Sequence, residues 1–398
     1  MKILNVFNRY LERGGEEEAV EQICDSLAKV VDLTRCDFAS ADWQGPGAPG
    51  MWQQALRMIH NPASAAKLEA CEKSRQSDAW LVHNVFPVGS GAVYSEAKKL
   101  GIPVIQYLHN FRPFSVNGYL WAGESLALGG LEKNFWREVK HGAWQDSRAK
   151  SAWFALVLSL GHKLGWWKNV RAWIAVSEFM RGKFIEAGVP SAEIFTLRHY
   201  WRPQPVPPPN VGQHFLYLGR LTEAKGIKML IGTWELLERQ TSTAPRLVIA
   251  GDGPLRSFVE AKVERMSAVT YAGELSGAAK AAALAGARAL IVPSLWWEGL
   301  GLVVYEAYDY ARPVLTARSG GLMEIVAEGE TGWLHEPGNI EQLAAQVRQL
   351  EENPALGRER GAAGRRWLLQ NADEKEWQQG FLKIAGYAMV PKASEQNS

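Results

Sequence analysis

Two glutamates beside a predicted helix start are the residues whose types and spacing point most directly to chemistry. An apolar run over 289–292 predicts a buried strand that ends at Pro293. Glu298 follows in a glycine-bearing loop, and seven residues separate it from Glu306, which lies in an apolar run that predicts a helix. Backbone N–H groups at a helix start favour phosphate, whereas carboxylates accept hydrogen bonds from hydroxyl groups. The pattern therefore indicates a ligand with phosphates in its middle and hydroxyls at its ends, as in a nucleotide sugar.

Two cations follow another predicted strand, at 215–218. Arg220 comes directly after Gly219, and Lys225 follows five residues later beside Gly226. Arginine binds phosphate through a planar fork and lysine as a point charge. The sequence has no Asp-x-Asp pair that could hold a divalent ion for a diphosphate leaving group. We therefore expect fixed cations at the phosphates, and neither a metal nor a cofactor. Taken singly, each of these acids and cations is also common on solvated loops and at helix starts.

Length, charge and cysteine content limit the class of protein. The 398 residues suit two domains, and 47% hydrophobic with 22% charged residues is ordinary for a globular chain. A formal net charge of +2 argues against a nucleic-acid partner bound by bulk charge. Cys24, Cys36 and Cys71 lack metal-type spacing and leave one cysteine unpaired, which favours the reducing cytoplasm. The polar run at 1–10 does not fit a signal peptide.

Aromatic and basic residues gather in one stretch of the chain. Seven of the 17 tryptophans fall between Trp121 and Trp173. The basic residues among them are Arg137, Lys140, Lys150, Lys163 and Lys168. This composition allows two interpretations, a peripheral contact with the inner face of the cell membrane or an aromatic core under helices, and the second is favoured. The longest apolar run, 152–160, is shorter than the roughly 20 residues that a membrane span needs.

Strands and helices alternate in two rounds. The first begins with a strand at 3–7, a loop that ends in Gly14 and Gly15, and a helix over 19–30, which is the opening unit of a doubly wound α/β domain. Further strands are expected at 79–83, 104–108, 172–176 and 195–197. His109 and Asn110 follow the strand at 104–108, and ligands bind at such strand ends in open α/β sheets. His109 is therefore a candidate site residue, although a lone histidine is more often structural.

Five prolines within 202–210 predict a stiff connector between the two rounds. Strands of the second round are expected at 215–218, 247–250, 269–272, 289–292 and 313–317. The predicted fold class is α/β, with two Rossmann-like α/β/α domains that face each other across a cleft. We expect an N-terminal acceptor-side domain over 1–201, a proline-rich hinge over 202–212, a C-terminal nucleotide-sugar-binding domain over 213–375, and a closing helix and tail over 376–398.

The motifs of the second round occur in a characteristic order. They are Gly219-Arg220 with Lys225-Gly226, Gly251-Asp252-Gly253-Pro254, Glu298 with Glu306, and Ser319-Gly320-Gly321 with Glu324. In this order they resemble the GT4-type retaining glycosyltransferases, which have the GT-B fold. The resemblance covers nearly the whole chain and is strongest over 215–333. The segment 110–189 is also similar to bacterial members that build exopolysaccharide and lipopolysaccharide chains.

The resemblance implies a role for each matching residue. Arg220 and Lys225 would contact the nucleotide diphosphate, Glu306 the ribose hydroxyls, and Glu298 the donor-sugar hydroxyls. His109 would lie beside the anomeric centre, so that the expected catalytic set is His109, Glu298, Arg220 and Lys225. The expected donor-binding set adds Gly14 and Gly15 from the first domain and, from the second, Gly219, the base-binding Gly273, Glu274 and Leu275, the loop Gly299, Leu300, Gly301 and Leu302, and Glu306.

The sequence departs from the family pattern at two places. Leu300-Gly301 stands where many members have an aromatic or other residue before the glycine, which bears on donor choice. Ser115 stands where related sequences have cysteine, so we expect neither a metal nor a disulfide in that loop.

The resemblance implies a retaining, metal-independent hexosyltransferase. It would move a sugar from a UDP- or GDP-sugar to a hydroxyl of a glycan or lipid-linked acceptor, in cell-surface polysaccharide assembly. The acceptor would enter on the face that the phosphate leaves, and the departing phosphate would take its proton. Two other classes stay open. One is a dinucleotide-dependent oxidoreductase, although Gly-x-Gly-x-x-Gly is absent after the first strand. The other is a non-catalytic protein that binds sugar or a membrane surface.

Overall fold

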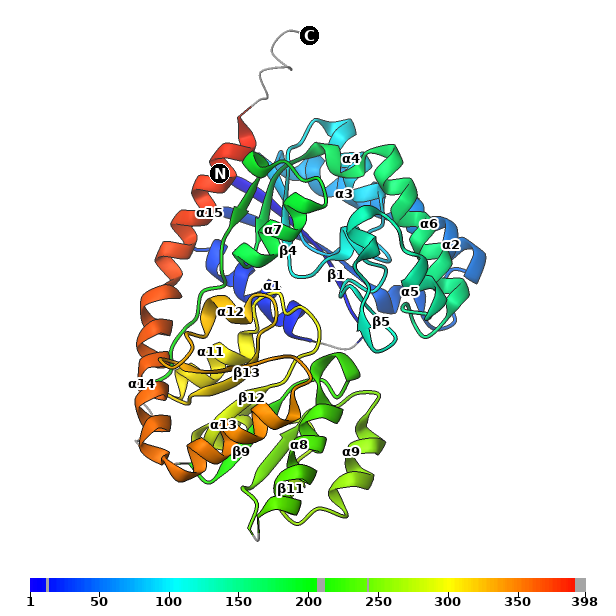
Figure 1. Ribbon diagram of the computed structural model, residues 1–398. Helices are drawn as coiled ribbons and strands as arrows, with labels where there is room; N and C mark the ends of the chain where they lie inside the picture. Colours follow the sequence, from blue (N-terminus) through cyan, green and yellow to red (C-terminus); the bar gives the residue numbers. More distant parts are fainter. Residues whose placement is uncertain (12–13, 206–211, 242, 391–398) are drawn as a thin grey trace. The chain divides into compact units, whose positions relative to one another are not determined.

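A computed structural model describes residues 1–11, 14–205, 212–241 and 243–390, and it divides into two compact units (Figure 1). The N-terminal unit combines Met1–Gly123, Ala127–His199 and the C-terminal helix that begins at Glu374. The C-terminal unit combines Glu124–Leu126 with Tyr200–Asp373. Each unit contains a six-stranded parallel sheet, which confirms the predicted α/β class. Positions 206–211 of the predicted hinge and 391–398 of the predicted tail lie outside the described residues.

All strands of the N-terminal sheet run parallel, in the order β2-β1-β3-β4-β7-β8. They are β1 (Lys2–Arg9), β2 (Asp32–Ala39), β3 (Ala79–Val82), β4 (Val104–Leu108), β7 (Val170–Ala175) and β8 (Ile194–Thr196). The central strands β3 and β4 are buried along their whole length, as expected when helices cover both faces of a parallel sheet. The order reverses at β1, so that loops from neighbouring strands leave a crevice at their carboxyl ends.

Eight helices belong to the described part of this unit. They are α1 (Gly15–Leu27), α2 (Met51–Ile59), α3 (Pro62–Arg75), α4 (Ala92–Leu100), α5 (Trp136–Lys140), α6 (Arg148–Leu164), α7 (Glu178–Glu186) and α15 (Glu374–Met389). Helix α15, red to orange in Figure 1, packs against α1 and against β3, β4 and β7. Ser177 caps α7, because its hydroxyl accepts a hydrogen bond from the Met180 N–H.

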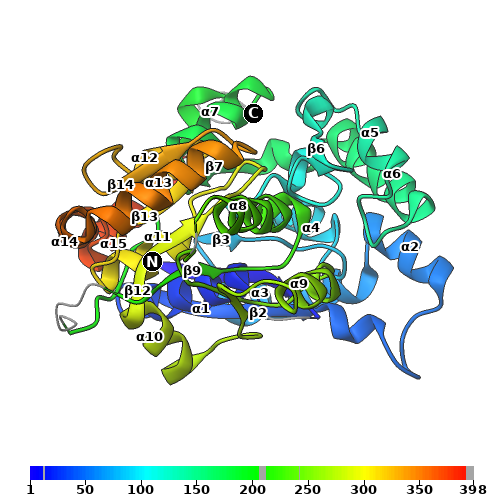
Figure 2. The same ribbon diagram turned by 60° about the horizontal axis from the view of Figure 1, so that its bottom comes forward.

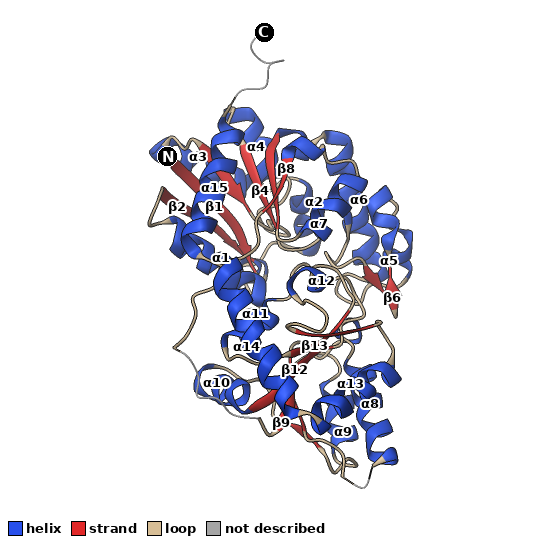
Figure 3. Ribbon diagram, turned by 60° about the vertical axis from the view of Figure 1, so that its left-hand side comes forward, coloured by secondary structure: helices blue, strands red, loops and turns tan. Residues whose placement is uncertain are grey.

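The C-terminal sheet has the order β11-β10-β9-β12-β13-β14, and Figure 3 separates its strands from the surrounding helices by colour. Its strands are β9 (His214–Leu218), β10 (Leu247–Ala250), β11 (Val269–Tyr271), β12 (Ala287–Val292), β13 (Val314–Ala317) and β14 (Gly332–His335). Each paired strand is parallel to its neighbour. The carboxyl ends of all six therefore meet at one edge of the sheet, where every motif of the second round lies.

Seven helices belong to this unit within the residues that the structure describes. They are α8 (Ile227–Gln240), α9 (Arg256–Val263), α10 (Gly277–Gly286), α11 (Leu302–Asp309), α12 (Leu322–Ile325), α13 (Ile340–Glu352) and α14 (Pro354–Asn371). The main hydrophobic core joins α8, α9 and α13 to the sheet, with Phe215, Trp234 and Leu343 among its fully buried residues. Helices α11 and α14 pack together and against β12. None of the helices described in either unit is both long and apolar enough to cross a bilayer.

Some elements differ from the sequence-based expectation. Strand β2 was not expected, because it is an edge strand whose polar and half-buried residues interrupt any apolar run. Helix α1 starts at Gly15 and ends at Leu27, earlier than the expected 19–30. The long segment at 110–130 contains only 3-10 turns and the two-residue strands β5 (Trp121–Ala122) and β6 (Ser125–Leu126), in agreement with the loop expected there.

Candidate active site

The loops at the carboxyl edge of the C-terminal sheet are joined by backbone hydrogen bonds. The Gly219 N–H donates to the Ala250 carbonyl over 3.1 Å, and the Gly251 N–H donates to the Gly273 carbonyl over 2.8 Å. The Tyr217 hydroxyl donates to the Arg220 carbonyl over 2.8 Å. Each loop therefore fixes the position of the next, and the edge forms one connected platform under the candidate residues.

Glu298 lies at the centre of this platform and is 5% exposed. Its Oε1 accepts three hydrogen bonds, from Lys225 Nζ over 2.7 Å, from Ser294 Oγ over 2.5 Å and from Trp296 Nε1 over 2.8 Å. Lys225 Nζ also lies 4.8 Å from the centre of the Trp296 ring. Among the described residues all hydrogen bonds to this carboxylate reach Oε1, which leaves Oε2 able to accept from a ligand.

The charge of Glu298 is stabilised by these partners. Burial alone raises its pKa, but the Lys225 ammonium and the hydrogen bonds from Lys225, Ser294 and Trp296 outweigh burial, so the pKa lies below the ordinary value. At neutral pH the side chain is therefore a carboxylate that can only accept hydrogen bonds.

Lys225 is placed by a close contact between two loops. Gly226 has φ +74°, and a Cβ there would lie 1.9 Å from the Pro293 carbonyl oxygen. The Leu295 N–H donates to the Ala224 carbonyl over 2.8 Å. Because only glycine fits this approach, the loop after β9 lies directly against the loop after β12, and Lys225 reaches Glu298.

Glu306, the second predicted acid, lies in α11 and is paired with a residue that the sequence analysis missed. Its Oε2 lies 2.8 Å from Lys280 Nζ of α10, and the Glu306 side chain is 18% exposed. The helix start before it is fixed by Gly301, which has φ +92°. Lys280 gives no signal in the sequence, because it occurs in an Ala-rich helix far from the motif and only the packing of α10 brings it near Glu306.

The remaining C-terminal candidates lie at the same edge. Arg220 is exposed, and it forms no ion pair within the described part of the chain. Gly273 has φ +68° in the turn after β11, and a Cβ there would meet no atom within 4 Å. The loop over 299–301 leads directly into α11, whose first backbone N–H groups have no partner inside the helix. Three of the predicted residues, Lys225, Glu298 and Glu306, thus occupy two ion pairs at this edge.

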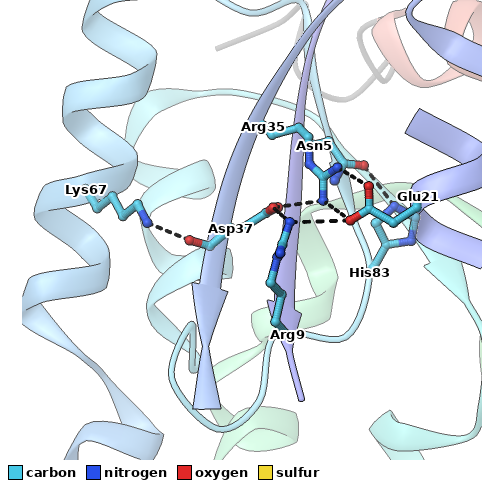
Figure 4. Close-up of polar contacts among 7 residues, drawn as sticks. All are labelled: Asn5, Arg9, Glu21, Arg35, Asp37, Lys67 and His83. Atoms are coloured by element: carbon cyan, nitrogen blue, oxygen red, sulfur yellow. Dashed lines mark hydrogen bonds and ion pairs between the residues drawn. The ribbon is translucent and has the colours of Figure 1, made fainter. Parts of the chain in front are cut away.

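In the N-terminal unit, His109 belongs to a group of stacked rings. His83 Nε2 and Asn5 Oδ1 are 2.9 Å apart (Figure 4), and His83 Nδ1 lies 2.9 Å from His109 Nε2. The His199 ring stacks on the His109 ring, with centroids 5.8 Å apart. Since Asn5 Oδ1 can only accept, His83 Nε2 donates to it, and His83 Nδ1 accepts a hydrogen bond from the His109 Nε2–H. His109 is thereby held in one tautomer, with its Nδ1 unprotonated.

Burial keeps these histidines neutral. It lowers the pKa of His83 to about 3 and the pKa of His199 to about 4. Burial and the neighbouring His83 and His199 also place the pKa of His109 well below its usual value. At neutral pH, His109 therefore lies at the end of β4 as an uncharged, oriented ring.

Glu16 lines the same pocket as His109. The sequence does not indicate it as a site residue, because an acidic run at a helix start is explained by the helix dipole. Asn110 Nδ2 donates to Glu16 Oε2 over 2.8 Å. Glu16, His109, Asn110 and Arg112 line a pocket of about 20 Å³, which is room for a single water molecule. Burial raises the pKa of Glu16 to about 7, although Tyr10, Arg112 and Asn110 favour its ionised form.

An ion-pair network fixes the helix that presents Glu16 (Figure 4). Glu21 of α1 accepts from Arg35 of β2 over 2.5 and 2.8 Å. Asp37 of β2 lies 2.8 Å from Arg35 and 3.2 Å from Arg9 of β1. The bidentate Arg35–Glu21 pair holds α1 at the edge of the sheet. Gly14 and Gly15 at the start of α1 are exposed, and a Cβ at either would meet no atom within 4 Å.

Replacement of Glu16 by glutamine is expected to change the pH dependence of stability. The folded pKa of about 7 lies well above the usual pKa of a glutamate in an unfolded chain. The folded chain therefore keeps a proton that the unfolded chain loses, and stability falls as pH rises through this window. We expect Glu16→Gln to raise the free energy of unfolding at pH 8 by about 2 kcal/mol and to leave it unchanged near pH 4. Urea unfolding at both pH values measures this, with the exposed Glu18→Gln as control. Equal curves for wild type and Glu16→Gln at pH 8 would contradict it.

The loop that contains Ser115 is expected to hold neither a metal nor a disulfide. Ser115 Oγ donates to Glu138 Oε1 over 2.7 Å, and Glu138 is 1% exposed. Cys24, Cys36 and Cys71 are all free. Within the ranges that the structure describes, no group of three or more His, Cys, Asp or Glu side chains is arranged to hold a metal ion. Metal independence stays a prediction.

Sequence comparison places part of the chain in a known family. Residues 204–367 match the family of glycosyl transferases group 1. The chain is 33% identical over 183 residues to the glycogen synthase of Mycobacterium tuberculosis. That match covers 45% of this chain and 43% of the relative, so the chain spans less than half the length of this curated relative. The range 204–367 that matches the family contains Arg220, Lys225, Glu298 and Glu306.

Solved structures resemble the chain over nearly its whole length. Sucrose-phosphate synthase from Thermosynechococcus elongatus gives a TM-score of 0.71 at 17% identity, covering 98% of this chain and 100% of the other. HepE from Anabaena in complex with UDP-glucose gives a TM-score of 0.66 at 15% identity. This match covers 97% of this chain and 99% of the HepE chain. At these identities the likeness concerns the fold alone. The chain thus has the fold of GT-B glycosyltransferases, and its residues 204–367 match the family model of glycosyl transferases group 1.

Proposed function

We propose that this protein is a retaining, metal-independent glycosyltransferase of the GT4 type. It transfers a sugar from a UDP- or GDP-sugar to a hydroxyl of a glycan or lipid-linked acceptor. The observation that supports this best is the ion pair between the partly buried Lys225 and the buried Glu298, 2.7 Å apart beside the start of α11. One site then offers a cation and helix N–H groups for phosphate and a fixed carboxylate for sugar hydroxyls.

Each side chain has a role in the proposed donor site. Arg220 and Lys225 bind the diphosphate, and Glu298 accepts hydrogen bonds from donor-sugar hydroxyls through Oε2. Glu306 accepts from the ribose hydroxyls, and the ion pair with Lys280 holds it in place. The turn at 273–275 contacts the base. The exposed position of Arg220 supports its role, since an exposed guanidinium is available for a phosphate.

The proposed mechanism follows from the charges that develop during transfer. As the bond between sugar and phosphate breaks, positive charge grows on the sugar ring and negative charge on the leaving phosphate. Arg220, Lys225 and the N-terminus of α11 stabilise the phosphate. The acceptor hydroxyl bonds to the anomeric carbon on the face that the phosphate leaves, and its proton passes to that phosphate. The products are the glycosylated acceptor and the nucleoside diphosphate.

The N-terminal unit supplies the acceptor side in this proposal. The neutral, oriented His109 lies beside the anomeric centre, and the backbone at Gly14 and Gly15 approaches the diphosphate. Both roles require the two units to face each other across a cleft, which remains part of the proposal. The solved complex of HepE contains UDP-glucose, which supports a UDP-sugar as one of the two donor classes. We further propose a cytoplasmic enzyme of cell-surface polysaccharide assembly.

A donor panel with and without EDTA tests the proposed reaction. The full chain is incubated with UDP-, GDP- and ADP-sugars, and released nucleoside diphosphate is measured. We expect release from a UDP- or GDP-sugar at the same rate in EDTA, because fixed cations neutralise the leaving group. The same donor should raise the thermal unfolding midpoint, since it binds only the folded state. No release and no binding with any donor would contradict the proposal, and loss of activity in EDTA would contradict its metal-independent part.

The same protein preparations distinguish the proposed glycosyltransferase from the two alternative functions. An oxidoreductase would bind NAD(P), which a fluorescence titration detects. A non-catalytic sugar-binding protein would show the thermal shift with donor but no release of nucleoside diphosphate. We expect neither result, because the family match and the ion pairs at 225, 298 and 306 lie in the same domain.

A further inference from the structure

Three helices of the N-terminal unit expose large apolar side chains. Trp52 and Leu56 on α2 are 78% and 65% exposed, and Trp136 on α5 is 70% exposed. On α6, Leu156 and Leu164 are 47% and 61% exposed. Single exposed apolar residues are common, whereas a group on neighbouring elements marks an interaction site. We call these five residues, together with Met51 of α2, the apolar surface.

The helices of the apolar surface lie side by side. Trp153 of α6 donates from Nε1 to the Ala55 carbonyl of α2 over 3.1 Å. Helix α5 packs against α6, and Figures 1 and 2 show α2, α5 and α6 grouped together from two directions. Trp52 and Leu56 are four residues apart, so they share one side of α2. The exposed side chains therefore belong to three helices that are packed together.

The charged side chains that these three helices expose are all basic. The only acid within the three helices, Glu138, is 1% exposed and accepts from Ser115 Oγ over 2.7 Å, so its charge is turned inward. Glu132 and Asp146 lie in the turns before α5 and α6. The basic residues of the three helices are Arg57, Arg137, Lys140, Arg148, Lys150 and Lys163. A chain with a net charge of only +2 thus concentrates positive charge next to its exposed apolar residues.

We propose that the apolar surface binds the anionic face of a lipid bilayer. Tryptophan and leucine side chains enter the boundary between headgroups and acyl chains, while lysine and arginine neutralise anionic headgroups. A second copy of this chain fits poorly, because a symmetric contact would bring the basic residues of both copies together. The surface differs from the tryptophan-rich segment expected from the sequence, since Trp166 and Trp173 are buried and Trp52 lies outside that segment. The proposal does not depend on the sugar transfer.

Vesicle flotation of the full chain tests the membrane contact. We expect the chain to float with phosphatidylcholine vesicles that contain phosphatidylglycerol, to stay unbound with phosphatidylcholine alone, and to be released by high salt. The double variant Trp52→Ser/Leu56→Gln should bind at least about 10-fold more weakly, because it removes two inserted side chains. Lys140→Gln/Lys150→Gln should lose a similar factor, about 10-fold, through charge.

Matched variants outside the three helices serve as controls. Leu369 of α14 is 49% exposed, and Leu369→Ser should float like the wild type, as should Arg358→Gln on the same helix. The folding of each variant is checked by its thermal unfolding midpoint. Nucleoside diphosphate release without vesicles should be unchanged in every variant. Absence of this release from the wild type would count against the proposed function, whereas absence of flotation would count against the membrane contact.

Three results would overturn the membrane proposal. One is a wild-type chain that does not float with anionic vesicles. Another is flotation of Trp52→Ser/Leu56→Gln at the wild-type level. The third is a dimer in solution that the same substitutions dissociate, which would assign the apolar surface to a second copy of this chain.

Discussion

Lys225→Ala should lower the rate of nucleoside diphosphate release by about 10²-fold or more, the scale of losing one preorganised charge at a developing anion. Lys225 Nζ lies 2.7 Å from Glu298 Oε1 and 4.8 Å from the centre of the Trp296 ring. The ammonium is thus held in position before any ligand arrives, so the site does not have to reorganise as negative charge grows on the leaving phosphate. Turnover with a saturating donor measures the loss.

The same substitution should also destabilise the fold, because it leaves a buried carboxylate without its cation. The Glu298 side chain is 7% exposed and the Lys225 side chain 26%. We expect a loss of about 2 kcal/mol, below the full penalty for breaking a buried pair because water reaches part of Lys225. Urea unfolding of the variant at pH 7 measures this loss.

A double variant separates the catalytic effect from the effect on stability. In Lys225→Ala/Glu298→Gln the buried site has no uncompensated charge, so stability should return toward the wild type. Turnover should remain at least about 10²-fold low, since the charge at the phosphate is still missing. Recovery of turnover together with stability would mean that Lys225 acts only by supporting the fold.

Lys228, three residues after Lys225, provides a control for the loss of a nearby lysine. It is exposed, and its Nζ pairs with Glu223 Oε2 over 2.6 Å. Lys228→Ala removes a lysine of the same helix start without touching Glu298, and its turnover should stay within about twofold of the wild type, as for a typical surface pair. Wild-type turnover in Lys225→Ala would contradict the role assigned to Lys225.

The strand ends of the C-terminal domain could be predicted because each strand gives a local signal. Runs of apolar residues at 215–218, 247–250 and 289–292 are each followed by glycine, proline or serine, and parallel strands bring such ends to one edge. The structure has strands at these positions. Lys225 and Glu298 could therefore be expected to lie near each other, and their side chains are in contact.

Partners that depend on packing could not be predicted in the same way. Lys280 meets Glu306 only because α10 packs beside β12, and nothing in the Ala-rich run around Lys280 indicates that position. Glu16 could not be recognised as a site residue from the sequence, because the helix dipole already explains an acidic run at a helix start. Ser294 and Trp296 lie in the same loop as Glu298, and a search for donors around that acid would have found them.

Gly320→Ala should disrupt the site through the backbone of the Glu298 loop. Gly320 has φ +58°, and a Cβ there would lie 2.2 Å from the Glu298 carbonyl oxygen and 2.8 Å from the Glu298 nitrogen. The Gly321 N–H donates to the same carbonyl over 2.8 Å, and Ser319 Oγ donates to the Trp296 carbonyl. The loop after β13 therefore holds the loop after β12, and only glycine allows this approach.

An added methyl group at position 320 has to displace the loop that carries the carboxylate. We expect stability to fall by about 3 kcal/mol, which combines the left-handed conformation with the backbone clash. Turnover should fall by about 10²-fold or more in the protein that remains folded, since a shift of about 1 Å at a positioned group has that effect. Thermal unfolding and donor turnover measured on the same preparation give both values.

Gly329→Ala is the matched control, because it isolates the cost of the backbone conformation. Gly329 has φ +79°, is exposed, and would place a Cβ within 4 Å of no other atom. We expect this variant to lose about 1 kcal/mol of stability through conformation alone and to keep its turnover. The difference between the two variants then reports the contact between the loops at 319–321 and 296–299. If Gly320→Ala matched Gly329→Ala in both measurements, Glu298 would be held by its side-chain partners alone, and the loop after β13 would have no part in positioning it.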